Sequence, residues 1–188
     1  AVEANPQDKK TWFELGTLLG ADLEQYGESA DALGKAVKLA PKDGGAWNNL
    51  GLSLEHIEKF KEAEKAFRKA IQLGKEPAAS ALSNLGMLLV LQGRFEEGEK
   101  YLRESLKFEP NSYKTSAMLF GLLISEDSRR NEGWEILKGL VSNPEIPKKD
   151  VSFATGLFVM IAAKGYGQEA LDILKESQWA DRLEPVVA

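Results

Sequence analysis

The sequence predicts an all-α solenoid built from stacked antiparallel pairs of helices. Over the 188 residues a glycine returns every 35 positions, and the residues around it return with it. Apolar residues also recur at the three- and four-residue spacing of helices. A helix pair of this length cannot bury its apolar stripe alone, so consecutive pairs must stack into a superhelix with a concave inner face. The five glycines are Gly16, Gly51, Gly86, Gly121 and Gly156.

Each repeat is expected to contain two helices joined by a short polar break. Glu58 and Lys59 form such a break in the second repeat, and Gln92 to Arg94 form one in the third. The periodic glycine falls inside the first helix, where it costs about 1 kcal/mol relative to alanine. We therefore expect a second helix to approach closely there, helped by small residues such as Gly98. The expected repeats form a single array over 8–42, 43–77, 78–111, 112–146 and 147–178, with a partial terminal helix over 179–188.

The second repeat carries the fullest motif. Its first helix has Trp47, Leu50 and Gly51, and its second helix has Ala63 and Phe67. This pattern resembles the tetratricopeptide repeat, whose signature is Trp-x-x-Leu-Gly, then a small–aromatic–small pattern and a closing proline. The resemblance covers nearly the whole chain and implies a right-handed superhelix. The first repeat has an extra residue in its turn, the fourth and fifth have lost the tryptophan, and the fifth has also lost the leucine.

The two ends of the chain fall inside repeats. Residues 1–6 align with residues 36–41 at the same 35-residue offset, so the chain opens within the second helix of an earlier repeat. Residues 179–188 have the pattern of a further helix that has no polar cap after it. We therefore expect this sequence to be a fragment of a longer protein.

Composition excludes several classes of function. The chain has no cysteine and a single histidine, His56, which excludes thiolate sites and multi-histidine metal sites. A net charge of −5 lacks the basic character of nucleic-acid binders, and no apolar run reaches the roughly 18–20 residues of a membrane span. No nucleophile–base pair can be assembled, and the stretch from Gly27 to Lys35 lacks the spacing of a phosphate loop. The sequence thus predicts no enzyme, cofactor, metal, nucleic-acid or membrane partner, and by default a cytoplasmic location.

The resemblance implies that partners bind in the inner groove, which the first helix of each repeat lines. Asn49 and Asn84 share one register there, where an amide can pair with the backbone of an extended peptide. All three methionines map to this face, as expected of a surface that accepts varied apolar partners; packing inside a closed groove is the alternative. Glu55 and His56 also map to this inner face. The candidate groove residues are Asn48, Asn49, Leu52, Asn84, Met87, Leu91, Met118, Leu122, Phe153, Leu157 and Met160.

One known use of such a groove is the carboxylate clamp that holds the acidic C-terminal tails of heat-shock chaperones. The clamp takes lysine, asparagine and arginine side chains from three successive first helices. Of the residues in the matching register only Asn49 fits, and no cation is available to pair with the tail carboxylates. Chaperone tails are therefore not the expected partners. The residues in that register are Phe13, Thr17, Asn49, Ser80 and Asn84.

Two hypotheses of function follow. In the first, the chain is a protein–protein interaction scaffold that holds an apolar peptide or a partner helix in its groove. In the second, it is an architectural or regulatory arm of a larger protein, with the groove filled by its own chain or by a second copy. The apolar side chains of the third to fifth repeats favour the first hypothesis, and the interrupted ends favour the second.

Overall fold

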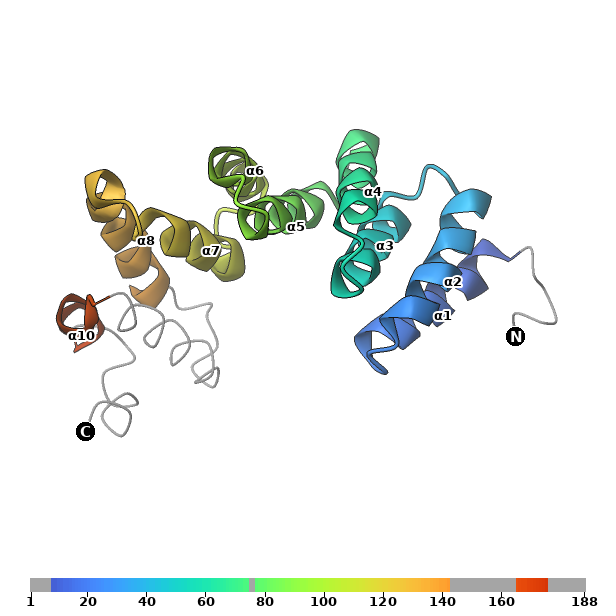
Figure 1. Cartoon of the computed structure of the whole chain (residues 1–188), viewed down its shortest axis with the longest axis horizontal. Helices are drawn as coiled ribbons and strands as arrows, with labels where there is room; N and C mark the ends of the chain where they lie inside the picture. The colour runs from blue at the N-terminus through green and yellow to red at the C-terminus, as the bar shows by residue number, and fades with distance from the viewer. Residues whose placement is uncertain (1–7, 75–76, 143–164, 176–188) are drawn as a thin grey trace. The chain divides into compact units, whose positions relative to one another are not determined.

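The computed structural model describes residues 8–74, 77–142 and 165–175, which form helices and turns without a strand. The chain divides into two compact units, Ala1–Phe108 (unit 1) and Glu109–Ala188 (unit 2). The described residues of each unit are mostly helical (Figure 1). The predicted all-α class is confirmed for the described residues.

Unit 1 is a stack of three antiparallel helix pairs. Within each pair the two helices are in direct contact, and the second helix of one pair also contacts the first helix of the next. The first helices contact one another as well, α1 with α3 and α3 with α5, so they form a continuous layer. The helices are α1 (Lys9–Ala21), α2 (Tyr26–Leu39), α3 (Gly44–His56), α4 (Phe60–Leu73), α5 (Pro77–Leu91) and α6 (Phe95–Phe108).

Local sequence explains where these helices begin and turn. The Asp43 carboxylate accepts a hydrogen bond from the Ala46 amide at 3.0 Å and so caps the start of α3. Each pair turns at a residue in the left-handed region, at Glu24 (φ 53°), Glu58 (φ 59°) and Gly93 (φ 77°). Only the third turn has the glycine that this conformation favours. The three turns therefore share a backbone shape that the residue type alone does not dictate.

The periodic glycines allow the close helix approach that the sequence predicts. A Cβ atom at Gly51 would lie 2.5 Å from the Phe67 ring, and one at Gly16 would lie 2.6 Å from Leu33 Cγ. The third repeat repeats this contact, since a Cβ atom at Gly86 would lie 2.8 Å from Leu102 Cγ. A glycine in the first helix thus admits a large side chain from the second helix of its own pair.

The core of unit 1 crosses the repeat boundaries. One buried cluster joins α2, α3 and α4, and it includes Val37, Leu50 and Ala66. A second cluster joins α4 to α5 through Phe67, Leu85 and neighbouring residues. Because each cluster takes side chains from two repeats, no repeat of unit 1 completes its core alone.

Unit 2 has a core of its own. It contains α7 (Tyr113–Leu123), the short 3₁₀ helix η1 (Asp127–Arg129), α8 (Arg130–Ser142) and α10 (Gly167–Lys175). The half-buried Trp134 packs on this core, with its ring 6.0 Å from that of Phe120 and edge-on to that of Tyr166 at 6.3 Å. Trp134 is thus a core residue. The buried members of the cluster are Phe120, Ile124, Leu137, Leu140 and Val141.

Candidate functional site

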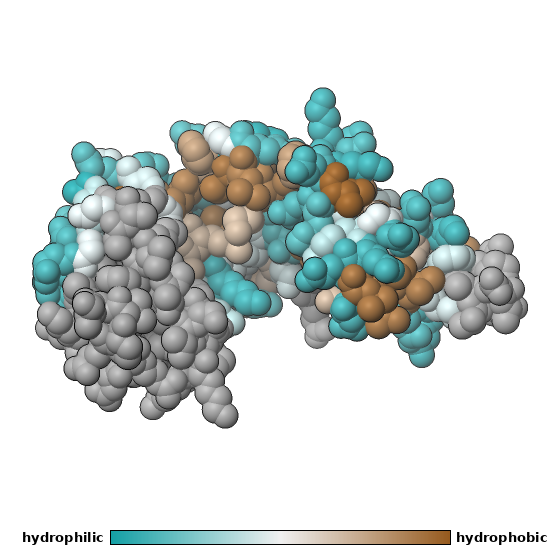
Figure 2. Space-filling view, turned by 60° about the horizontal axis from the view of Figure 1, so that its bottom comes forward, coloured by the Kyte–Doolittle hydropathy of each residue, from teal (hydrophilic) through white to brown (hydrophobic). Residues whose placement is uncertain are grey.

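The layer of first helices in unit 1 carries most of the predicted groove residues. Leu52 and Met87 are half-buried at the surface of α3 and α5, and Leu91, the last residue of α5, is 66% exposed. A space-filling view shows apolar side chains gathered in patches between hydrophilic ones (Figure 2). We call the surface formed by α1, α3 and α5 the first-helix face and define it by Thr17, Asn49, Leu52, Glu55, Asn84, Met87 and Leu91.

Two asparagine contacts link adjacent helices of this face. The Asn84 amide donates to Asn48 Oδ1 at 3.0 Å, and the Asn49 amide lies 3.4 Å from Thr17 Oγ1. Asn48 is only 8% exposed, so it is not an open contact residue, contrary to the expectation from its register. Its side chain instead holds that of Asn84 through this hydrogen bond. Within the described residues the amide oxygens of Asn49 and Asn84 accept no hydrogen bond. Both oxygens therefore remain able to accept a backbone N–H from a partner.

A pocket of about 360 Å³ opens between α1, α2 and α3. Its floor is the buried pair Ser29 and Ser53, whose hydroxyl oxygens lie 2.7 Å apart. At one wall the Tyr26 ring stacks on the His56 ring, with centroids 3.8 Å apart. The pocket depends on Gly20, because a Cβ atom there would lie 2.8 Å from Ser29 Oγ. The lining residues are Gly16, Thr17, Gly20, Ala21, Tyr26, Ser29, Leu33, Asn49, Leu52, Ser53 and His56.

The sequence predicts only part of this pocket. Asn49, Leu52 and His56 were expected on the inner face, whereas Tyr26 and Ser29 were not, because they belong to a second helix. The small residues of α1 that line the pocket, Gly16, Gly20 and Ala21, were the available signal, because small residues at helical spacing leave room beside a helix.

Glu55 is a half-buried carboxylate on the first-helix face. Burial raises its pKa, because removal from water disfavours the charged form. No described residue forms an ion pair or hydrogen bond with its carboxylate. These surroundings differ from those of Glu64 of α4 and Glu97 of α6, each of which is paired with arginine.

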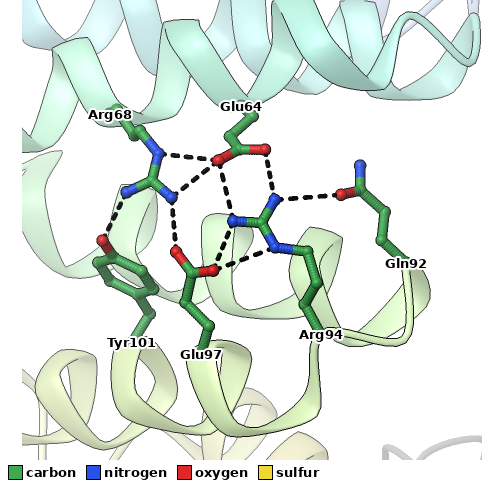
Figure 3. Close-up of polar contacts among 6 residues, drawn as sticks. All are labelled: Glu64, Arg68, Gln92, Arg94, Glu97 and Tyr101. Carbon is green, nitrogen blue, oxygen red and sulfur yellow. Dashed lines mark hydrogen bonds and ion pairs between the residues drawn. The ribbon is translucent and has the colours of Figure 1, made fainter.

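The second helices carry a network of ion pairs (Figure 3). Arg68 Nη2 of α4 lies 2.7 Å from both Glu64 Oε1 and Glu97 Oε1, and Arg68 Nη1 donates to the Tyr101 hydroxyl at 2.6 Å. Arg94 Nη1 lies 2.8 Å from Glu64 Oε2, and its Nε lies 3.0 Å from Glu97 Oε2. The charged side chains of α4, of α6 and of the turn before α6 thus form a set of interlocked ion pairs between two repeats.

The remaining predicted residues belong to unit 2. Met118 of α7 is half-buried, whereas Leu122 is 9% exposed and belongs to the buried interior. Leu122 was expected to line an open groove. Its side chain is instead buried among the apolar residues of the interior. Phe153, Leu157 and Met160 lie outside the described residues, as do Trp179 and the expected helix over 179–188.

The described part of the chain holds no group of three histidine, cysteine or acidic residues placed to bind a metal ion. None of the described helices is long and apolar enough to cross a membrane.

The stacked helix pairs and their layer of first helices define a helical-repeat protein. Models of the tetratricopeptide repeat match residues 10–43 and 43–108. The chain belongs to the tetratricopeptide-repeat family, whose fold is a scaffold for protein–protein interaction.

Similar proteins fall in the same fold. The crystal structure of MamA superposes with a TM-score of 0.67 at 22% identity, covering 74% of this chain and 80% of that one. YrrB, described as a TPR protein with an unusual peptide-binding site, gives a TM-score of 0.65 at 21% identity over 99% of this chain and 94% of its own. The peroxisomal targeting signal receptor of Kluyveromyces lactis is 37% identical over 73 residues. That match spans 38% of this chain and only 13% of the receptor.

Proposed function

We propose that this chain is an interaction scaffold that binds an extended peptide on the first-helix face of unit 1. The observation that carries the proposal is the combination, on one face, of two amide oxygens that accept no hydrogen bond and apolar side chains open to solvent. The amides of Asn49 and Asn84 can pair with a peptide backbone, while Leu52, Met87 and Leu91 can contact its apolar side chains.

The pocket between α1 and α3 adds an anchoring position. Its volume of about 360 Å³ accommodates one large apolar side chain, and it adjoins Asn49 and Leu52 of the same face. Burial of a few apolar groups at about 25 cal/mol per Å² supplies micromolar affinity once the costs of association are subtracted. A solved relative in fold, YrrB, is described as having a peptide-binding site, which supports the same class of partner here.

The predicted groove residues of unit 2 stand outside this proposal. Met118 of α7 lies 35 residues after Ser83 and belongs to unit 2, so it stays a prediction from register. Leu122 is excluded because it is buried. Phe153, Leu157 and Met160 remain predictions from register.

The test uses a phage-displayed library of random peptides, selected on the whole chain. We expect the recovered peptides to bind with micromolar affinity in fluorescence anisotropy. Leu91→Glu should weaken that binding by about tenfold or more, because it places a charge among apolar contacts. Phe95→Glu is the matched control: Phe95 is also an exposed apolar side chain, 48% exposed, but it begins α6 and lies off the first-helix face.

Circular dichroism establishes that both variants keep the helicity of the unmodified chain. Recovery of no specific peptide would overturn the proposal, and so would peptides that bind the Leu91→Glu and Phe95→Glu variants equally well.

A further inference from the structure

Glu55 is a carboxylate on an otherwise uncharged pair of neighbouring helices, and the charged residues Glu58 and Lys59 follow it in the turn after α3. The helices α3 and α5 contain no lysine and no arginine, and Glu55 is their only carboxylate. It lies one turn after Leu52 on the first-helix face, and its helix, α3, contacts α5, which carries Met87 and Leu91. A charge in this position needs a physical explanation.

No cation of the described chain neutralises Glu55. The first helices of unit 1 have lysine or arginine only in α1, as Lys9 and Lys10, and Lys10 lies 3.7 Å from Glu14 in an exposed pair. By contrast, Glu64, Glu97 and Glu99 each lie within 3.0 Å of an arginine nitrogen. The chain thus pairs its half-buried carboxylates elsewhere and leaves this one open.

Two effects make the unpaired carboxylate unfavourable. Glu55 is half-buried, so its charge has lost part of its hydration. It is also the penultimate residue of α3, where the carbonyl end of the helix carries partial negative charge that repels an anion. Both effects reverse when a cation approaches, because a cation interacts favourably with the carboxylate and with the carbonyl end of the helix.

We propose that the peptide bound on the first-helix face carries a lysine or arginine that pairs with Glu55, flanked by apolar side chains that contact Leu52, Met87 and Leu91. This inference rests on the proposed peptide-binding function and specifies the class of peptide. Glu55 then determines specificity: it selects a basic residue at one position of an otherwise apolar segment. Charge complementarity identifies the occupant, since an apolar or acidic residue at that position leaves the carboxylate desolvated and unpaired.

The experiment measures binding of synthetic peptide pools to the whole chain. Each pool has one fixed central residue, which is lysine, arginine, norleucine or glutamate, with mixed apolar and polar residues on either side. We expect the lysine and arginine pools to bind the unmodified chain about tenfold more tightly than the norleucine pool, with the glutamate pool weakest. Glu55→Gln should reduce that preference to about twofold or less, and Glu55→Lys should shift the preference to the glutamate pool.

The matched control is Glu62→Gln, because Glu62 is an exposed carboxylate of α4 outside the first-helix face. It removes the same charge and should leave the preference for basic pools intact. Equal binding of all pools, or a basic preference that survives Glu55→Gln, overturns the role of Glu55. If all pools bind alike and Leu91→Glu still weakens their binding, the peptide-binding function stands without a role for Glu55. If no pool binds, both proposals fail.

Discussion

At the scale of single residues, glycine has two different roles in these helices. Gly51 lies against the Phe67 ring, which would be 2.5 Å from an added Cβ atom, so the packing of α3 on α4 requires glycine there. Gly34 of α2 has open space around it, with nothing within 4 Å of an added Cβ atom. The same residue type is thus a packing requirement at one position and only a weakness of the helix at the other.

This contrast predicts opposite effects of two alanine substitutions. Gly51→Ala should lower the free energy of unfolding by about 1–3 kcal/mol, because the strain of overpacking exceeds the gain in helix propensity. Gly34→Ala should raise it by about 0.5–1 kcal/mol, because no contact opposes the gain in propensity. Urea unfolding followed by circular dichroism measures both. A Gly51→Ala variant as stable as Gly34→Ala would show that α4 can move away from α3 without cost.

At the scale of elements, polar contacts decide how neighbouring helices join. Glu64 and Arg68 of α4 meet Glu97 and Tyr101 of α6, and Arg94 binds both carboxylates from the turn before α6. An isolated surface ion pair contributes little to the stability of a fold. Here each arginine pairs with two carboxylates, one from each of two neighbouring repeats, so the pairs form a connected network. Burial acts to raise the pKa of Glu64, yet its bonds to Arg94 and Arg68 outweigh burial and hold the pKa below its ordinary value. The bonds to Arg68 and Arg94 likewise lower the pKa of Glu97.

The direction of these pKa shifts predicts loss of stability in acid. A carboxylate whose pKa is lowered on folding stabilises the native state above its ordinary pKa of 4.5, and the contribution disappears as the pH falls through the lowered value. The melting temperature should therefore decrease between about pH 5 and pH 3. In the double variant Glu64→Gln with Glu97→Gln, this decrease should be shallower, and the melting temperature at neutral pH should be lower by about 3 °C.

Thermal melts followed by circular dichroism across this pH range provide the measurement. Glu62→Gln serves as the control for loss of a surface charge. A double variant with the same pH dependence as Glu62→Gln would mean that the network adds nothing to stability.

At the scale of the whole molecule, the sequence predicted the period and the helix pairs but not the contacts between pairs. The 35-residue spacing follows from the backbone, which every repeat shares, so the glycines and their partner helices could be located. Contacts between repeats depend on how far one helix is rotated against the next. Asn48 was predicted to lie open because its register allows it, yet the rotation of α5 brings Asn84 over it. Leu122 shows the same limit, because an apolar side chain on a helix fits an open groove and a core equally well until its neighbours are placed.

The predicted alternative of self-association is tested by the mass of the whole chain in solution. If the first-helix face is free for a peptide, size-exclusion chromatography with light scattering should give a monomer, and Leu91→Glu should leave the mass unchanged. The apolar contact of one exposed side chain is too small to hold a dimer by itself. A dimer that Leu91→Glu dissociates would instead identify the face as an assembly interface and favour the architectural hypothesis.

The two junctions between the three helix pairs of unit 1 are chemically different, although the backbone is similar. The first junction includes the hydrogen-bonded hydroxyls of Ser29 and Ser53, and the second includes the guanidinium groups of Arg68 and Arg94. The pairs are consequently not interchangeable parts. A tandem copy of the second repeat would set Arg68 opposite Ala66 in place of Tyr101, and would bring Lys59 where Arg94 belongs. The side chains therefore encode the order of the repeats, and the backbone encodes only their shape.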